Sequence, residues 1–301
     1  MDTYNNANIL QILAIKIRKE LEESKVDLDK VQEIRLREGR PICVKMGREN
    51  QFLSYVVKQH EIKETLDYIS HYSLYAYENE MRQGFLTIEG GHRVGIAGKV
   101  IIDGGKIRNF QYISGLNIRV SREVKGCADF LFPKILDDND AVNTMIISPP
   151  GSGKTTLLRD LVRQFSDGNQ YLKGVPVSIV DERSEIAGCY RGVPQNDVGK
   201  QTDVLDACPK TEGMTMAIRA LAPKILAVDE IGTFEDVKCI SYAVLSGVSV
   251  LVTVHGHSLE EIHEKPALKD LLGQNVFQRY ILLGDKVGEI KAIYNGRGEC
   301  I

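Results

Sequence analysis

Residues 146–160 read IISPPGSGKTTLLRD, which is an apolar strand end, a loop of small residues and the start of a helix. The loop meets the pattern G-x-x-x-x-G-K-[ST] of phosphate-binding loops at every position but the first, where Ser148 replaces glycine. Pro149 and Pro150 carry no backbone N–H group, so the groups that cradle a phosphate begin at Gly151. The substitution leaves this part of the loop intact, and the stretch predicts a nucleotide site.

Each residue type in the loop has a role in holding ATP. Gly151 and Gly153 allow the backbone to turn consecutive N–H groups inward, and the following helix adds its own free N–H groups and the positive end of its dipole. Lys154 supplies a positive charge for the β- and γ-phosphates, and the hydroxyl of Thr155 is a ligand for Mg²⁺. The predicted nucleotide-binding residues are Pro150, Gly151, Ser152, Gly153, Lys154, Thr155 and Thr156.

A second motif lies 75 residues after Lys154. Residues 224–232, KILAVDEIG, are an apolar strand that ends in Asp229 and Glu230. Asp229 is placed to hold the Mg²⁺ shell, and Glu230 to polarise a water for attack on the γ-phosphate. An acidic pair at a strand end is common, but behind a phosphate loop it favours ATP hydrolysis over phosphoryl transfer to a small molecule.

Two more apolar runs end in polar side chains, IVDERSE (179–185) and LVTVHGHS (251–258). Because ligands bind at the carboxyl ends of parallel strands, we expect both clusters to face the nucleotide. Solvated acids and a structural histidine are the alternative interpretations. The His-x-His pair lacks a third ligand at a recognisable spacing, so we expect no zinc site. The candidate catalytic residues at this edge are Glu230, Lys154, Glu182, Glu185 and His255.

The second part of the chain has the pattern of a doubly wound α/β domain. Continuous apolar runs, which are typical of parallel strands buried on both faces, lie at residues 142–148, 175–181, 224–229 and 248–254. Crossover helices are expected at residues 155–165, 214–221 and 234–245. We therefore expect a P-loop domain with a mostly parallel sheet over residues 126–301, in which residues 187–213 form a long, turn-rich connection.

Residues 1–125 predict a separate, smaller α/β domain. Its expected elements are an amphipathic helix over residues 9–21, a β-hairpin over 31–47, a helical stretch over 61–83 and glycine-punctuated strands over 87–124.

Composition and charge exclude several classes of protein. The 301 residues, 43% hydrophobic and 26% charged, suit a soluble globular chain with room for two domains. The formal net charge of −3 gives no electrostatic case for a nucleic acid as the main partner. The six cysteines form no C-x-x-C pair, so we expect reduced thiols, and no apolar run reaches the ~18–20 residues of a membrane span.

These motifs, in this order, resemble the ATPases of type II and type IV secretion and of pilus motors. In that family the phosphate loop precedes an acidic box, here Asp181–Glu185, then the second nucleotide motif and a histidine box, here Thr253–His255. The stretch AIRALAPKILAVDEIG (217–232) also resembles that family, which adds Arg219 to the candidate catalytic residues. Longer stretches resemble the stage III sporulation protein AA family of endospore-forming bacteria: EIRLREGRPI (33–42), GFLTIEGGHRVGIAGKV (84–100) and VDERSEIAGCYRGVPQNDVG (180–199).

The resemblance implies a RecA-like ATPase domain behind a small N-terminal domain, with ATP as substrate and Mg²⁺ as cofactor. It implies a cytoplasmic protein of the mother cell that forms a hexameric ring. This ring would dock on the inner-membrane part of a channel between mother cell and forespore, without spanning the membrane itself. Arg93, Arg119 and Arg122 of the first domain are the candidate arginine fingers that cross subunit boundaries.

Three other functions stay open. A nucleic-acid-stimulated ATPase is disfavoured by the net charge, and a small-molecule kinase by Glu230 and the histidine box. The third is a scaffold that binds a nucleotide without hydrolysing it.

Overall fold

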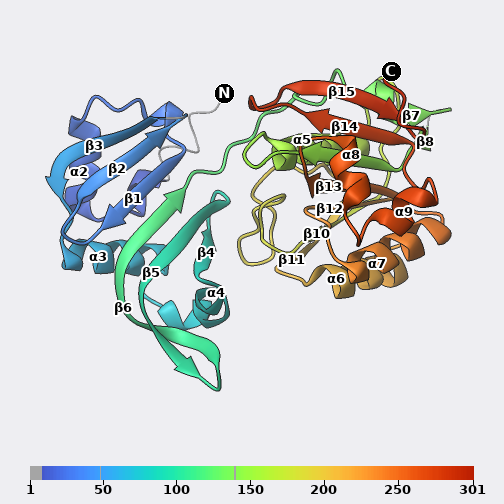
Figure 1. Ribbon diagram of the computed structural model, residues 1–301. Helices are drawn as coiled ribbons and strands as arrows, with labels where there is room; N and C mark the ends of the chain where they lie inside the picture. The colour runs from blue at the N-terminus through green and yellow to red at the C-terminus, as the bar shows by residue number, and fades with distance from the viewer. Residues whose placement is uncertain (1–8, 48, 139) are drawn as a thin grey trace. The chain divides into compact units, whose positions relative to one another are not determined.

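The computed structural model describes residues 9–47, 49–138 and 140–301, which divide into two compact units (Figure 1). Unit 1 holds the described residues up to Arg122 together with Gly188–Tyr190, and unit 2 holds the other described residues. In the described ranges, no helix combines the length and the apolar character that a membrane span requires.

Unit 1 is built on an antiparallel sheet. Among its described residues the strand order is β3-β2-β1-β6-β5-β4, and neighbouring strands run antiparallel. The strands are β1 Glu33–Arg37, β2 Pro41–Met46, β3 Glu49–Val56, β4 Phe85–Ile88, β5 His92–Asp103 and β6 Lys106–Arg119. The β1–β2 hairpin turns at Gly39, whose φ of 69° suits a residue without a side chain.

The helices of unit 1 are α2 Ile15–Glu23, α3 Gln59–Ile69 and α4 Glu78–Gln83. The helical stretch that we expected over residues 61–83 is interrupted after α3, because His71 and Tyr72 take φ values of 47° and 61°, which a right-handed helix cannot continue. The chain resumes through a 3₁₀ turn, Leu74–Tyr77, before α4. Apolar side chains of the helices and of one face of the sheet share a single buried core.

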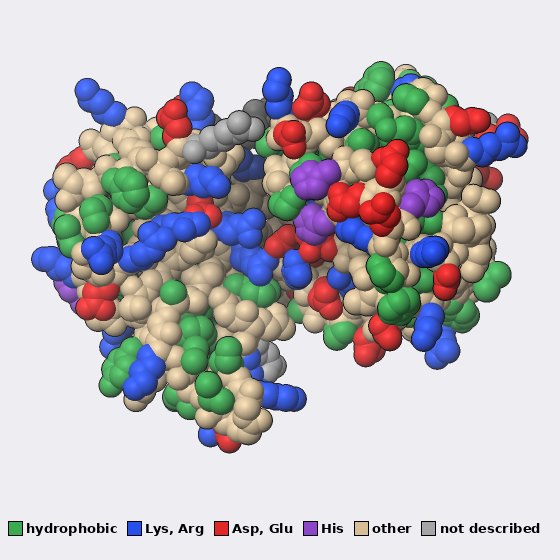
Figure 2. All heavy atoms as spheres, in the orientation of Figure 1, with side chains coloured by type: hydrophobic (Ala, Val, Ile, Leu, Met, Phe, Trp, Pro, Cys, Tyr) green, Lys and Arg blue, Asp and Glu red, His purple; other side chains and the backbone are tan. Residues whose placement is uncertain are grey.

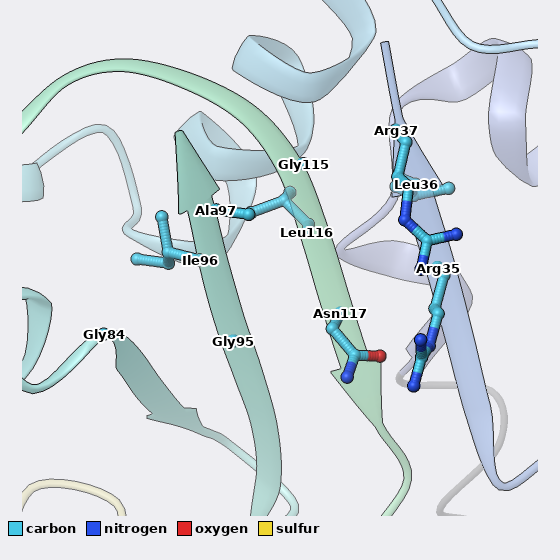
Figure 3. Close-up of a pocket in the computed structure, with 10 residues that line it drawn as sticks. All are labelled: Arg35, Leu36, Arg37, Gly84, Gly95, Ile96, Ala97, Gly115, Leu116 and Asn117. Atoms are coloured by element: carbon cyan, nitrogen blue, oxygen red, sulfur yellow. The ribbon is translucent and has the colours of Figure 1, made fainter. Parts of the chain in front are cut away.

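The other face of the unit 1 sheet carries a shallow hollow of about 220 Å³ (Figure 3). The hollow is open because Gly95 and Gly115 have no side chains to fill it. A Cβ atom at Gly115 would also lie close to the backbone, at 3.3 Å from the carbonyl oxygen of Leu36. Arg35 and Arg37 line the hollow, since they alternate along β1 with apolar residues that face the core. This face of unit 1 is therefore basic, and its core lies on the helix side.

Unit 2 contains the predicted parallel sheet. Over the described residues its order is β11-β10-β12-β13-β9-β14-β15, parallel throughout except for the β14–β15 pair. The strands are β9 Thr144–Ser148, β10 Val177–Asp181, β11 Thr202–Asp206, β12 Ile225–Val228, β13 Ser249–His255, β14 Arg279–Leu283 and β15 Ile290–Asn295. A small separate hairpin consists of β7 Leu136–Asp137 and β8 Asp140–Ala141.

Helices connect these strands at the three places that we expected, and α8 and α9 add two that we did not predict. They are α5 Lys154–Asp167, α6 Lys210–Met216, the π-helical segment η4 Ala217–Leu221, α7 Phe234–Leu245, α8 Leu259–Glu264 and α9 Lys269–Gly273. The connection over residues 187–213 is less irregular than we expected, because it contains the edge strand β11, which pairs in parallel with β10.

The strand order sets the place of the site. Strands β10, β12, β13 and β9 are consecutive neighbours in the sheet, so the loops after Asp181, Val228, His255 and Ser148 emerge side by side. Ser148 and His255 are direct partners in the ladder. Motifs up to about a hundred residues apart in the chain thus meet at one edge.

Candidate functional site

The predicted phosphate loop, residues 149–153, joins β9 directly to α5. Gly151 and Gly153 take φ values of 78° and 94°, the left-handed backbone that the sequence required of them. Gly153 is the residue at which α5 begins, so the free N–H groups of the first helical turn point out of this loop. Ser148 is fully buried, and its hydroxyl donates a hydrogen bond of 2.6 Å to the carbonyl oxygen of Pro149.

Lys154 lies at the centre of a buried ionic cluster. Its Nζ atom is 2.6 Å from Oε1 of Glu230 and 3.2 Å from Oδ1 of Asp229. The lysine side chain is only 8% exposed, so solvent screens these two ion pairs weakly. Lys154, predicted to bind phosphate, therefore contacts both Asp229, predicted to hold Mg²⁺, and Glu230, predicted to polarise a water.

Two hydroxyl groups fix the carboxylate of Asp229. Thr155 Oγ1 donates to Asp229 Oδ2 at 2.8 Å, and Thr253 Oγ1 donates to Asp229 Oδ1. Thr253 Oγ1 also accepts a 2.9 Å hydrogen bond from the backbone N–H of Glu230. Carboxylate and hydroxyl oxygens are the ligands that Mg²⁺ prefers, so the donor set of Thr155 and Asp229 fits that cation.

Three basic side chains surround the carboxylate of Glu230. It has a left-handed backbone, with φ of 58°, and its Oε2 accepts a 2.6 Å hydrogen bond from Arg183. His255 Nε2 lies 2.9 Å from Glu230 Oε1, and because an ionised carboxylate can only accept, Nε2 carries the proton. Burial alone would raise the pKa of Glu230, but Lys154, Arg183 and His255 together lower it to about 2.

The first acid of the acidic box, Asp181, is bound to the backbone of its own loop. Asp181 is buried and accepts hydrogen bonds from three consecutive backbone N–H groups, those of residues 185–187, at 2.8–3.0 Å. Burial raises its pKa to about 6, against the effect of these three bonds and with a contribution from Asp206. Asp181 therefore shapes the loop. Glu182 forms a 3.3 Å ion pair with Lys210, and the carbonyl oxygen of Glu185 accepts from Arg159 at 2.7 Å.

Arg219 is not part of this cluster. It lies exposed on η4, at the end of α6 that leads to the amino end of β12, whereas the site lies at the carboxyl end. Arg93 and Arg119 are cross-strand partners in unit 1, where Arg93 stacks on the ring of Phe85 at 3.7 Å. Arg122 donates to a carbonyl oxygen of the same unit at 2.7 Å. The roles of these arginines toward a nucleotide stay predictions.

Several contacts were not visible in the sequence. Lys210 Nζ donates to the carbonyl oxygen of Glu230 at 2.7 Å, and Lys265 Nζ donates to that of His255. The loop between β14 and β15 touches the phosphate loop, where the N–H of Gly288 donates to the carbonyl oxygen of Ser152 at 3.0 Å. Lys210, Lys265 and Gly288 do not lie at strand ends, so the spacing of motifs in the sequence does not reveal these contacts.

The whole chain matches a known protein family. A family model described as "Sporulation stage III, protein AA" covers residues 3–301. The chain belongs to this family. Among curated proteins, the stage III sporulation protein AA of Bacillus subtilis (strain 168) is 43% identical over 273 residues, which are 90% of this chain and 89% of that protein.

Solved structures of secretion-type ATPases share the fold. The Legionella pneumophila ATPase DotB aligns with a TM-score of 0.61 at 15% identity, over 90% of this chain and 76% of its own. The pilus retraction motor PilT, solved with bound ADP, aligns with a TM-score of 0.56 at 16% identity, over 91% of this chain and 77% of its own. At such low identity the likeness concerns the fold alone. It confirms the predicted RecA-like domain behind a small N-terminal domain.

Proposed function

We propose that this chain is a Mg²⁺-dependent ATPase that forms a ring and drives or assembles a secretion-like channel during endospore formation. The observation that carries the ATPase part is the cluster at Asp229 and Glu230, which brings together Lys154 and Thr155 from the start of α5 and His255 from the end of β13. A lysine for phosphate, a hydroxyl for Mg²⁺ and an ionised glutamate for water are the parts that ATP hydrolysis requires.

Binding of ATP changes the partner of Lys154. In this structure Lys154 Nζ is held by Glu230 at 2.6 Å, and it must release that carboxylate to reach phosphate oxygens. Glu230 then loses its closest counter-charge, and its pKa rises from about 2 towards the ordinary range. A carboxylate with a higher pKa is a better proton acceptor, so binding itself prepares Glu230 to orient and deprotonate water. His255, which donates to the same carboxylate, keeps the side chain in place during this exchange.

Thr155 and Asp229 are the residues that would hold Mg²⁺. When bound, this ion supplies Lewis-acid stabilisation of the phosphate charge. Thr253 contributes by keeping Asp229 in its orientation through their hydrogen bond.

The cellular part of the proposal rests on family membership and on the fold. The chain belongs to a sporulation family, and DotB and PilT, which share its fold, are by name an ATPase and a pilus retraction motor. We therefore infer a cytoplasmic hexamer of the mother cell that docks on an inner-membrane component of a sporulation channel. In a ring, exposed Arg219 and the candidate fingers Arg93, Arg119 and Arg122 would act on the nucleotide of a neighbouring copy.

A steady-state ATPase assay tests this proposal. Lys154→Ala should lose nucleotide binding, and Glu230→Gln should hydrolyse ATP more slowly by a factor on the order of 10² or more. Glu235→Gln, which changes an exposed glutamate at the start of α7, is the matched control and should hydrolyse normally. Removal of Mg²⁺ by EDTA should abolish turnover, and mass measurement with a non-hydrolysable ATP analogue should give the hexamer. Wild-type turnover by both site variants would rule out the proposed mechanism, and stimulation by DNA would favour the nucleic-acid-stimulated alternative.

A further inference from the structure

Strands β5 and β6 continue beyond the sheet of unit 1 as a two-stranded arm (Figure 1). β4 pairs with β5 only over residues 92–95, and β1 pairs with β6 only over residues 115–119. Within the described chain, residues 98–113 therefore have no strand partners but each other, and we call them the hairpin arm. The arm turns at Gly104 and Gly105, which take φ values of 55° and 79°.

The tip of the hairpin arm is apolar and exposed. Ile102 is 65% exposed, and its cross-strand partner Ile107 is 44% exposed. Ile101, which precedes Ile102 on β5, is 42% exposed. Nearer the sheet the arm is covered in part, since Phe110 and Ile113 pack against the core of unit 1, while Tyr112 is 62% exposed. Large apolar side chains gathered in one exposed place mark a surface that binds another molecule.

The charge of the arm is opposite to that of the chain. The arm carries Lys99, Lys106 and Arg108 against the single acid Asp103, whereas the whole chain has a net charge of −3. Asp103 lies 3.7 Å from Arg108 and opposite Lys106 in the ladder. In Figure 2, hydrophobic side chains gather over the lower part of unit 1, where Figure 1 places the arm, with Lys and Arg side chains among them.

We propose that the tip of the hairpin arm inserts into the surface of an anionic lipid bilayer. Successive residues of a strand face opposite sides, so Ile101 and Ile102 point away from each other. A flat protein surface would cover only one of these sides, whereas fluid lipid surrounds both. The two or three residues from the isoleucines to the turn span roughly 7–10 Å, which matches the ~5–10 Å depth of interfacial insertion.

The backbone of the arm argues against an added protein strand as the occupant. The β5–β6 ladder shifts its register at Ala97/Gly98, at Lys99/Val100 and at Ile101/Ile102, each time with an extra residue on β6. Such bulges twist a strand edge and interrupt its row of hydrogen-bonding groups, which prevents regular pairing with another chain. Lys99, by contrast, lies behind the isoleucines and Lys106 lies beside the turn. Both suit lipid phosphates, because the stem of a lysine can lie along apolar surface while its ammonium group stays in water.

Co-sedimentation of the full chain with vesicles tests the proposal. We expect binding to vesicles that contain phosphatidylglycerol, with weaker binding to pure phosphatidylcholine and at high salt. The double variant Ile102→Asn, Ile107→Asn should lose about tenfold or more in apparent affinity, because it removes the exposed apolar surface of one face of the tip. The matched control is Phe52→Asn, which changes a 63% exposed side chain on β3 of the same unit and should bind normally.

A charge variant separates the two contributions. Lys99→Ala with Lys106→Ala should weaken binding to phosphatidylglycerol vesicles and leave phosphatidylcholine binding unchanged, whereas Lys63→Ala, on exposed α3 surface, should change neither. Equal thermal midpoints of all variants show that the fold is kept.

The proposal is overturned if the wild-type chain does not sediment with anionic vesicles, or if Phe52→Asn loses as much affinity as the tip variant. It is also overturned if the tip variant changes the oligomeric mass and leaves vesicle binding intact, since a second copy would then cover the isoleucines. Vesicle binding is measured without nucleotide, so its result is independent of the proposed ATPase activity.

Discussion

Replacement of Glu230 by glutamine should tighten ATP binding while it slows hydrolysis. The carboxylate holds Lys154 at 2.6 Å, and the lysine must leave it to bind phosphate. A neutral glutamine forms no ion pair, so Lys154 then has only its 3.2 Å ion pair with Asp229 to release before it binds the phosphates. The hydrolytic step suffers because the amide cannot accept a proton from water.

The pKa of Glu230 gives the magnitude. Burial opposes ionisation, yet Lys154, Arg183 and His255 bring the pKa from its ordinary 4.5 to about 2, which corresponds to about 3 kcal/mol in favour of the ionised form. Arg183 is 56% exposed, so solvent screens its effect on Glu230. Lys154 is buried and contributes the largest part of the energy that lowers the pKa of Glu230. If Lys154 contributes about half of this energy, its release makes ATP binding about tenfold tighter.

Calorimetric titration with a non-hydrolysable ATP analogue, at equal ionic strength for each variant, measures this effect. Glu235→Gln is the control and should bind like the wild type.

The same ion pairs predict that the stability of the fold depends on pH. The depressed pKa of Glu230 stabilises the folded, nucleotide-free chain above pH 4.5, and this stability is lost as the pH falls from 4.5 through about 2. Glu230→Gln should lack that loss in urea denaturation.

In the calorimetric experiment, an affinity of Glu230→Gln for the ATP analogue that is equal to or weaker than that of the wild type would refute the competition between Glu230 and phosphate for Lys154.

Three further predictions concern the backbone of the site. Ser148→Gly removes only the 2.6 Å bond to the carbonyl oxygen of Pro149, so calorimetry should show ATP affinity that is unchanged or modestly tighter, and a large loss would mean that the hydroxyl contributes to binding. Gly153→Ala places a Cβ atom on a backbone with φ of 94°, at 3.4 Å from the side chain of Val287. In a urea titration, this variant should have a free energy of unfolding about 1–3 kcal/mol lower than the wild type. Equal stability of the two proteins would contradict this prediction. The raised pKa of Asp181, about 6, means that the folded chain binds a proton that the unfolded chain has already released, so stability should fall as the pH rises from about 4 to 6. Asp181→Asn should flatten this slope in denaturation curves recorded across that range, and an unchanged slope would assign it to another group.

The core of the ATPase-like unit was predictable from the sequence because its signals are strong and local. Four continuous apolar runs correspond to β9, β10, β12 and β13, since strands buried on both faces need no polar positions. The acidic pair and the histidine then follow two of these strands, and the parallel arrangement alone brings them together. The parallel sheet therefore led us to expect that Asp229, Glu230 and His255 would lie near Lys154.

Other parts were hidden for definite physical reasons. Strand β11, TDVLD, lies at the sheet edge and is half exposed, so it carries acids where a central strand would be apolar. The break after α3 depends on positive φ values at His71 and Tyr72, which neither residue type signals. Lys210 and Lys265 reach the site from helix ends, and their contacts to backbone carbonyl groups leave no pattern in the sequence.

The position of β9 in its sheet also bears on how the chain is made. β9 carries the phosphate loop, but its two neighbours, β13 and β14, end at His255 and Leu283, more than a hundred residues further along the chain. At a synthesis rate of ~5–20 residues per second, roughly 7–27 s pass between the emergence of Ser148 and that of Leu283. Until residue 255 has emerged, both edges of this apolar strand are unpaired and the site lacks His255, and from then until Leu283 emerges the edge that pairs with β14 stays open. On the ribosome the site is therefore incomplete until residue 255 has emerged, and β9 is not paired on both edges until Leu283 has.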